Sequence, residues 1–120
     1  MNKQIGFTLI ELVVVMVLLG ILAAIAVPKF VDLAPEAQQA STDGVAGALG
    51  SASSVNYGAC KAGSASCVPV ANCTATGGLL QGGLPTGYSI TAAPVALDAS
   101  VSCTVTRTSG ETATFMAIGT

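Results

Sequence analysis

The most pronounced pattern in the chain is an apolar run close to its N-terminus. From Phe7 to Val27 there are 21 residues, all apolar or small apart from Thr8 and Glu11. As an α-helix this stretch would be about 31 Å long, which matches the hydrocarbon core of a bilayer. The run therefore predicts a membrane-spanning helix over residues 7–28.

Two residues of that helix weaken it locally. Gly20 and Pro28 both have low helix propensity, and Pro28 also removes the hydrogen bond to the carbonyl of Ala24. Membrane helices tolerate such residues when neighbours satisfy the backbone. We expect the helix to bend or to unwind locally between Gly20 and Pro28.

The pattern becomes amphipathic over residues 29–57, where apolar side chains recur at helical spacings. They are Phe30, Leu33, Ala37, Ala40, Val45, Ala48, Leu49, Ala52 and Val55. The helix is therefore predicted to continue beyond the membrane, with a second bend near Leu33 because Pro35 lies in its path. We expect Gly58 to end it.

The period changes to two in the C-terminal third of the chain. Residues 60–83 are rich in small and polar residues and predict an irregular loop with one short helical turn within 72–81. After a turn at 84–87, alternating apolar and polar residues predict three short antiparallel strands, at 88–91, 100–106 and 113–118. Such a sheet needs a cover for its apolar face, and only the amphipathic helix is long enough. The predicted fold is α+β, a long N-terminal helix packed against a small sheet.

Glu11 is the residue that a simple membrane anchor does not explain. A charged glutamate within an apolar helix costs on the order of 2.5 kcal/mol or more to insert, and less near the interface. If the chain were cut between Gly6 and Phe7, the new α-ammonium would lie one helical turn from Glu11, in the same chain or in a neighbour. We therefore expect a cleaved N-terminus to be the partner of this carboxylate.

These N-terminal residues resemble those of type IV pilins. The resemblance rests on a short leader with Lys3, a glycine at position 6, the sequence Phe7–Glu11 and an apolar run that ends in Pro28. It implies that a prepilin peptidase cleaves after Gly6 and methylates the amine of Phe7. It also implies assembly into a helical filament with the N-terminal helices at its centre, for which we expect Phe7, Glu11, Gly20 and Pro28 to be assembly residues.

The same resemblance divides the chain into three segments. They are a leader at 1–6, a membrane-spanning and filament-core helix at 7–28, and an extracytoplasmic pilin domain at 29–120. The implied partners are other copies of the chain, the peptidase, and an assembly platform at the inner membrane, before the subunit enters a pilus on the cell surface. The continuation from Val27 to Leu33 is further similar to pilins of the mannose-sensitive haemagglutinin type.

Composition excludes several other functions. Charged residues make up 8% of the chain, with four basic and six acidic, so no basic patch for nucleic acid is present. The chain has no histidine and its acidic residues are scattered, so nothing pairs a nucleophile with a base. We expect neither enzymatic activity nor a cofactor, and the sequence leaves the surface ligand of a filament unknown.

Four cysteines allow three disulfide pairings, and in an exported domain two disulfides are the expected state. Cys60 and Cys67 enclose a short loop, while Cys73 lies in the connecting loop within reach of Cys103 on its strand. We favour the pairs Cys60–Cys67 and Cys73–Cys103. A zinc site made by the same thiols is the alternative, although the spacing includes no CxxC pair.

Three further interpretations compete with a subunit of a filament used for adhesion, surface motility or DNA uptake. One is a pseudopilin of a type II secretion system, a group that resembles pilins but whose major members have an acidic calcium-binding loop near the C-terminus; here that region has only Asp98 and Glu111. Another is a membrane-anchored binding domain that never polymerises. The last is a secretory signal peptide cleaved after Ala26.

Overall fold

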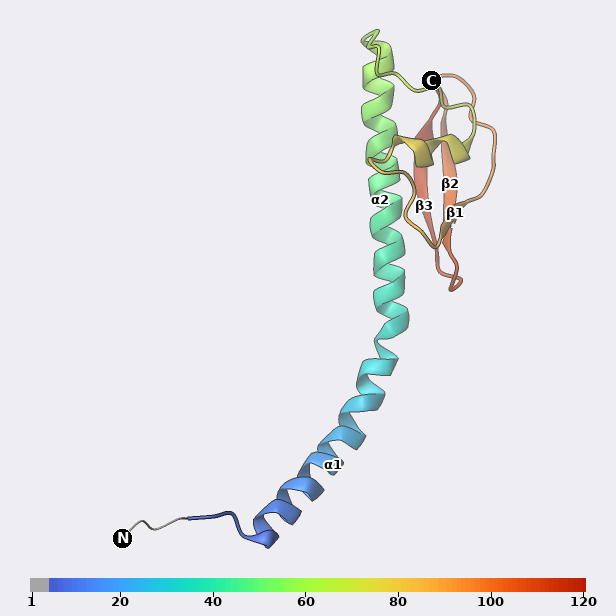
Figure 1. Ribbon diagram of the computed structural model, residues 1–120. Helices are drawn as coiled ribbons and strands as arrows, with labels where there is room; N and C mark the ends of the chain where they lie inside the picture. The colour runs from blue at the N-terminus through green and yellow to red at the C-terminus, as the bar shows by residue number, and fades with distance from the viewer. Residues whose placement is uncertain (1–4) are drawn as a thin grey trace. The chain divides into compact units, whose positions relative to one another are not determined.

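The computed structural model describes residues 5–120, without the side chains of residues 30–32. It contains two helices, a short 3₁₀ helix and three strands (Figure 1): α1 (Leu9–Asp32), α2 (Ala34–Lys61), η1 (Cys73–Leu79), β1 (Tyr88–Ile90), β2 (Ser100–Arg107) and β3 (Thr112–Ile118). These elements form two compact units, residues 1–35 and 36–120. The long N-terminal helix and the three-stranded antiparallel sheet confirm the predicted α+β class.

Helix α1 runs without interruption through Gly20 and Pro28. The local unwinding expected between these residues is therefore not found in the single chain. The helical backbone is interrupted at Leu33 instead, close to the bend predicted there. Pro35 lies in the first turn of α2, where backbone N–H groups have no partner within the helix, so its missing N–H removes no hydrogen bond.

The buried face of α2 differs from the apolar stripe predicted for it. The buried residues follow a helical spacing along one side of α2 and are Thr42, Ala46, Leu49, Ser53 and Asn56. Only Leu49 belongs to the predicted stripe, and Val55 from that stripe is 73% exposed. The buried polar side chains are tolerated because each is hydrogen bonded; Ser53 Oγ, for example, accepts a bond from the N–H of Ile118.

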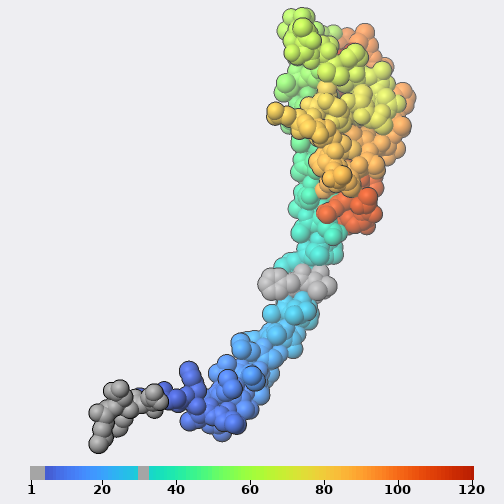
Figure 2. Space-filling view, viewed as in Figure 1, coloured from blue at the N-terminus to red at the C-terminus, as the bar shows by residue number. Residues whose placement is uncertain are grey.

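The sheet has the order β1–β2–β3 with both pairs antiparallel. Cys103 lies opposite Phe115, and on β3 the buried residues Phe115 and Ala117 alternate with exposed Thr114 and Met116. The core lies between this face, α2 and the connecting segments, and contains Ala46, Leu49, Cys73, Val95, Cys103, Val105, Phe115 and Ala117. The loop and η1 form much of one face of the globular unit (Figure 2).

Helix α2 ends at Lys61, three residues beyond the predicted end at Gly58. Its termination is a Schellman motif, in which Ser64 N donates to Ala59 O and Gly63 N donates to Cys60 O. Gly63 has φ 68°, a conformation that glycine adopts without steric cost. Gly58 has no such role because the backbone bonds continue past it.

Candidate assembly site

The start of α1 is closed by reciprocal hydrogen bonds between Thr8 and Glu11. Thr8 immediately precedes the helix, and its N–H donates to Glu11 Oε2 at 2.8 Å. Glu11 N in turn donates to Thr8 Oγ1 at 3.4 Å. This arrangement is a capping box, which satisfies two backbone donors that the helix itself cannot pair. The carboxylate also lies at the positive end of the helix dipole.

The capping box gives Glu11 a partner that sequence reasoning missed. We expected the α-ammonium of Phe7, but in the uncut chain Phe7 is joined to Gly6 and has no free amine. The signal was present as Thr8–x–x–Glu11 directly before an apolar run, a pattern typical of a helix N-terminus. The pairing with a cleaved N-terminus concerns the processed chain and stays a prediction.

The bond between Gly6 and Phe7 lies outside regular structure. Both residues precede α1, and the Phe7 side chain is 93% exposed. Apart from its neighbours in the chain, no described atom lies within 4 Å of the position that a Cβ on Gly6 would occupy. Phe7 and Glu11 line the same shallow hollow on the helix start, together with Ile10. The scissile bond predicted from the sequence is thus accessible and adjacent to the carboxylate.

From Leu12 to Pro28 the surface of α1 is apolar on every side. Within the described residues, one helical segment, Leu9–Lys29, is long and apolar enough to cross a membrane, and none of it is buried. A Cβ on Gly20 would meet no described atom within 4 Å, so this glycine leaves a free notch in the surface. A helix that is hydrophobic all round needs lipid or other protein around it. Pro28 lies close to the polar end of the same surface.

The four cysteines form two disulfides, Cys60–Cys67 and Cys73–Cys103. The sequence favoured this pairing. Cys73 and Cys103 are both buried in the core, where their bond ties η1 to the central strand β2. Since all four sulfurs are used in this way, they do not form the alternative zinc site.

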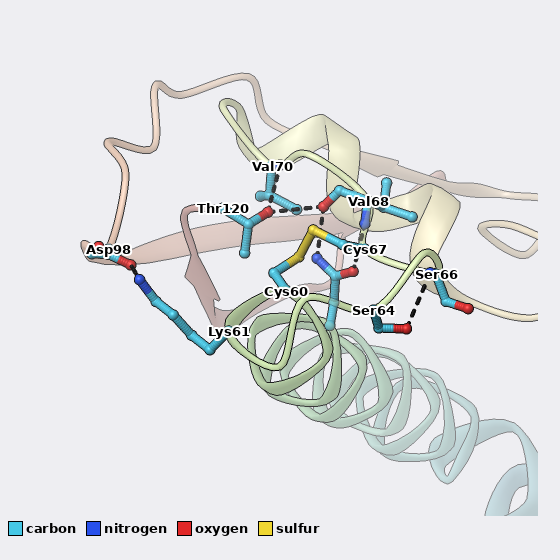
Figure 3. Close-up of a disulfide and its surroundings, with 10 residues drawn as sticks. Cys60, Lys61, Ser64, Ser66, Cys67, Val68, Val70, Asp98 and Thr120 are labelled. Carbon is cyan, nitrogen blue, oxygen red and sulfur yellow. Dashed lines mark hydrogen bonds and ion pairs between the residues drawn. A yellow bond between two sulfur atoms is a disulfide. The ribbon is translucent and has the colours of Figure 1, made fainter.

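The loop closed by Cys60–Cys67 is held by further bonds (Figure 3). The side chain of Asn56 donates to Val68 O at 2.8 Å and accepts from Val68 N at 2.9 Å. Thr120 Oγ1 also donates to Val68 O, and the backbones of Thr120 and Val70 exchange two bonds. The end of α2, the loop and Thr120 are therefore fixed to one another.

An ion pair joins the last residue of α2 to the segment before β2. Lys61 and Asp98 are in contact, and the Lys61 ammonium lies 5.3 Å from the centre of the Tyr57 ring. The hydrogen bond from Lys61 holds the pKa of Asp98 below its ordinary value, and the same bond raises the pKa of Lys61. Asp98 also adopts φ 60°, a backbone conformation that aspartate tolerates better than most residues.

Comparison with known proteins agrees with the geometry at the N-terminus. Residues 1–27 match the family model described as the prokaryotic N-terminal methylation motif. The chain is 62% identical over 47 residues to a type IV narrow pilus major component of Thermus thermophilus, a match that covers 39% of this chain and 40% of the relative. It is 46% identical over 56 residues to a fimbrial protein of Moraxella nonliquefaciens, covering 47% and 36% of the two chains. A type IV major α-pilin of Moraxella bovis is 50% identical over 44 residues, covering 37% and 28%.

The N-terminal part of the chain is thus similar to the type IV pilins that its sequence resembles. The chain spans less than half the length of each of these relatives. The relatives are named as pilus and fimbrial proteins, which are structural and not enzymatic. None of the three is named as a pilin of the mannose-sensitive haemagglutinin type, so that finer resemblance stays a prediction. No solved structure gives a significant match.

Proposed function

We propose that the chain is a structural subunit of a type IV pilus, assembled through α1. The observation that carries this proposal is an apolar helix that is exposed along Leu9–Lys29 and whose only acidic residue before its last turn, Glu11, lies at its start. A membrane anchor needs the apolar surface, and in an anchor the acid would serve only to cap the start of the helix. A subunit that leaves the membrane for a helical bundle uses both, because the apolar surface packs and the charge fixes the position of each subunit.

Processing would prepare this surface for assembly. A prepilin peptidase would cleave the exposed Gly6–Phe7 bond, release the leader at residues 1–6 and methylate the Phe7 amine. The new ammonium would then lie beside the capping box of Thr8 and Glu11, in its own chain or in a neighbour. In a dry bundle a carboxylate stays charged only when a cation and hydrogen bonds replace water. Thr8 supplies a hydrogen bond in the single chain, and the ammonium would supply the cation.

The rest of the chain follows from this role. The helix over residues 7–28 would span the inner membrane before assembly and line the filament core afterwards, with Gly20 and Pro28 as points of close approach or local unwinding. The domain over residues 29–120 would face outward, stapled by its disulfides. We propose adhesion, surface motility or DNA uptake as the use of such a filament, with an assembly platform at the inner membrane as the partner during its growth.

The direct test is to express the chain in cells that contain a prepilin peptidase and a pilus assembly system but lack their own major pilin. Surface filaments that react with an antibody to residues 36–120 would support the proposal. A chain that is cleaved and folded but stays in the inner membrane would contradict it and would favour an anchored domain. Filaments confined to a short periplasmic form would favour the pseudopilin alternative.

A further inference from the structure

A groove runs along the globular unit between α2 and the outer edge of β3. It has a volume of about 780 Å³. One wall is a helical stripe of small or short residues on α2, and the floor is the strand itself, including Thr114 and Met116. Asp43 is the one charged residue that lines it within the described part of the chain, and its side chain is exposed.

The outer edge of β3 is capped by α2 at both ends but not between them. Gln39 Nε2 donates to Thr112 O at 3.0 Å, and Ser53 Oγ accepts from Ile118 N at 2.9 Å. In the middle, Gly50 presents no side chain, and even a Cβ there would have as its nearest atoms Phe115 Cβ at 3.8 Å and Met116 N and O at 3.9 Å. The absence of side chains on this part of α2 is what opens the groove, and it lets another backbone approach closely.

Most of the charged side chains that the structure describes are not in an ion pair within one copy. Among the described residues the structure has a single ion pair, Lys61–Asp98. Asp43 Oδ1 accepts a bond from Gln39 Nε2 at 2.8 Å, which orients its carboxylate without neutralising it. Lys29 lies in the last turn of α1 and is in no ion pair among the side chains that the structure describes, which exclude those of residues 30–32. One copy thus offers an acid beside a groove and a cation at the end of an apolar helix.

We propose that the C-terminal end of α1 of a second copy docks at this groove, with its Lys29 paired to Asp43. This inference rests on the proposed function, since it names the surface that a neighbouring subunit in the filament would cover. The occupant is a helix end with the small residues Ala24 and Ala26, which suits a wall made of glycine and serine. The charges are complementary, and each copy carries both halves of the contact, so the contact repeats from subunit to subunit as a polymer requires.

The Lys29–Asp43 pair would set the alignment of neighbouring subunits more than the stability of the contact between them. An exposed ion pair adds little to stability, but like charges brought together in a wrong alignment repel each other. The contact would therefore favour the alignment in which Lys29 meets Asp43 over the neighbouring ones. It should weaken at high salt, because the pair lies at the rim of the groove and is screened.

Charge exchange tests the pairing. Filament yield should fall several-fold for Lys29→Glu and for Asp43→Lys, and should recover when the two changes are combined in one chain. Glu36→Lys is the matched control, since it makes the same charge reversal on α2 outside the groove and should leave the yield near that of the wild type. A double variant no better than the single ones would count against the pairing.

A disulfide trap gives a second readout that does not depend on yield. Lys29→Cys combined with Asp43→Cys should give disulfide-linked dimers and longer ladders in oxidised filaments, and either change alone should give none beyond background. Normal filaments without such ladders, or a bond formed only within one chain, would overturn the inference and leave the proposed function intact. If the wild-type chain forms no filaments, the proposed function itself fails.

Discussion

Asn56 pairs with the backbone of Val68 as a strand residue would, donating to its carbonyl and accepting from its N–H. The two residues are 12 positions apart, and the pairing fixes the Cys60–Cys67 loop to α2. Asn56 is buried, so its amide could not exchange these bonds for water at low cost.

Replacing Asn56 by alanine should lower the free energy of unfolding by about 1–3 kcal/mol, because it removes the partner of Val68 N and one of the two partners of Val68 O. Asn56→Asp should be at least as destabilising as alanine, since it sets a buried carboxylate oxygen, which cannot donate, against Val68 O. Urea denaturation of the full chain in detergent measures both. Equal stability of Asn56→Ala and wild type would show that Val68 is satisfied by other means, such as Thr120 Oγ1.

The two disulfides should contribute unequally to stability. Cys73–Cys103 closes a loop of 30 residues and Cys60–Cys67 one of 7. The loss of chain entropy predicts about 3.6 and 2.4 kcal/mol respectively. Replacing the Cys73–Cys103 pair by alanines should therefore destabilise the domain more, and the loss of packing in the core adds to the difference. Thermal denaturation of the two double variants compares them.

The oxidation state is checked separately. Alkylation of the exported protein without reductant should label no cysteine, and peptide mapping should recover Cys60 with Cys67 and Cys73 with Cys103. Labelling of two or more thiols would show that at least one of the two disulfides is absent from the exported protein.

The ion pair of Lys61 and Asp98 should make a pH-dependent contribution to stability. The pKa of Asp98 is lowered in the folded state, so its contribution is present above the ordinary aspartate pKa of about 3.9 and is lost as pH falls through the lowered value. The pKa of Lys61 is raised, so its contribution is present below about pH 10.4 and is lost as pH rises further.

Lys61→Met tests this expectation. The wild type should exceed the variant in melting temperature between about pH 5 and pH 9, by a small margin that shrinks in high salt because both groups are exposed. The margin should disappear near pH 2. A margin that is the same at pH 2 and pH 7 would assign the effect to packing of Lys61 against Tyr57.

Glu11→Val should insert into the membrane more readily and fold its disulfide-linked domain normally, yet assemble poorly or only together with wild-type subunits. The reason is that the α-ammonium of Phe7 would have no carboxylate partner in any alignment. A subunit added out of register would then be no less favourable than one added correctly. Thr8→Ala is the companion variant, since it removes the hydroxyl of the capping box and keeps the charge. Abundant regular filaments made only of Glu11→Val subunits would leave apolar packing as the sole organiser of assembly.

Periodicity in the sequence predicts where the helices and strands lie, but it does not predict which side of α2 is buried. The three strands and the short turn at η1 lie where alternation and turn residues predicted them. The buried side of α2 was missed because Thr42, Ser53 and Asn56 are polar, and their partners are known only once the chain is folded. Ser53, for instance, meets Ile118, 65 residues away.

In the candidate assembly site, too, residues that are close in the sequence could be predicted, whereas contacts between distant residues could not. Gly6, Phe7 and Glu11 could be singled out because their pattern is contiguous. The capping box of Glu11 is also a local pattern, Thr8–x–x–Glu11. A charge within an apolar helix, however, can be stabilised either by a cation or by a backbone N–H, and the pattern alone does not choose between them. The groove beside Asp43 could not be foreseen, since it depends on which side of α2 lies along β3.

The intact mass of the subunit recovered from purified surface filaments tests the central claim most directly. We predict the mass of residues 7–120 with one added methyl group on Phe7 and with the hydrogens of four thiols removed by two disulfides. A subunit that begins at Met1, or one that begins at Val27, would contradict assembly through a processed Phe7 helix.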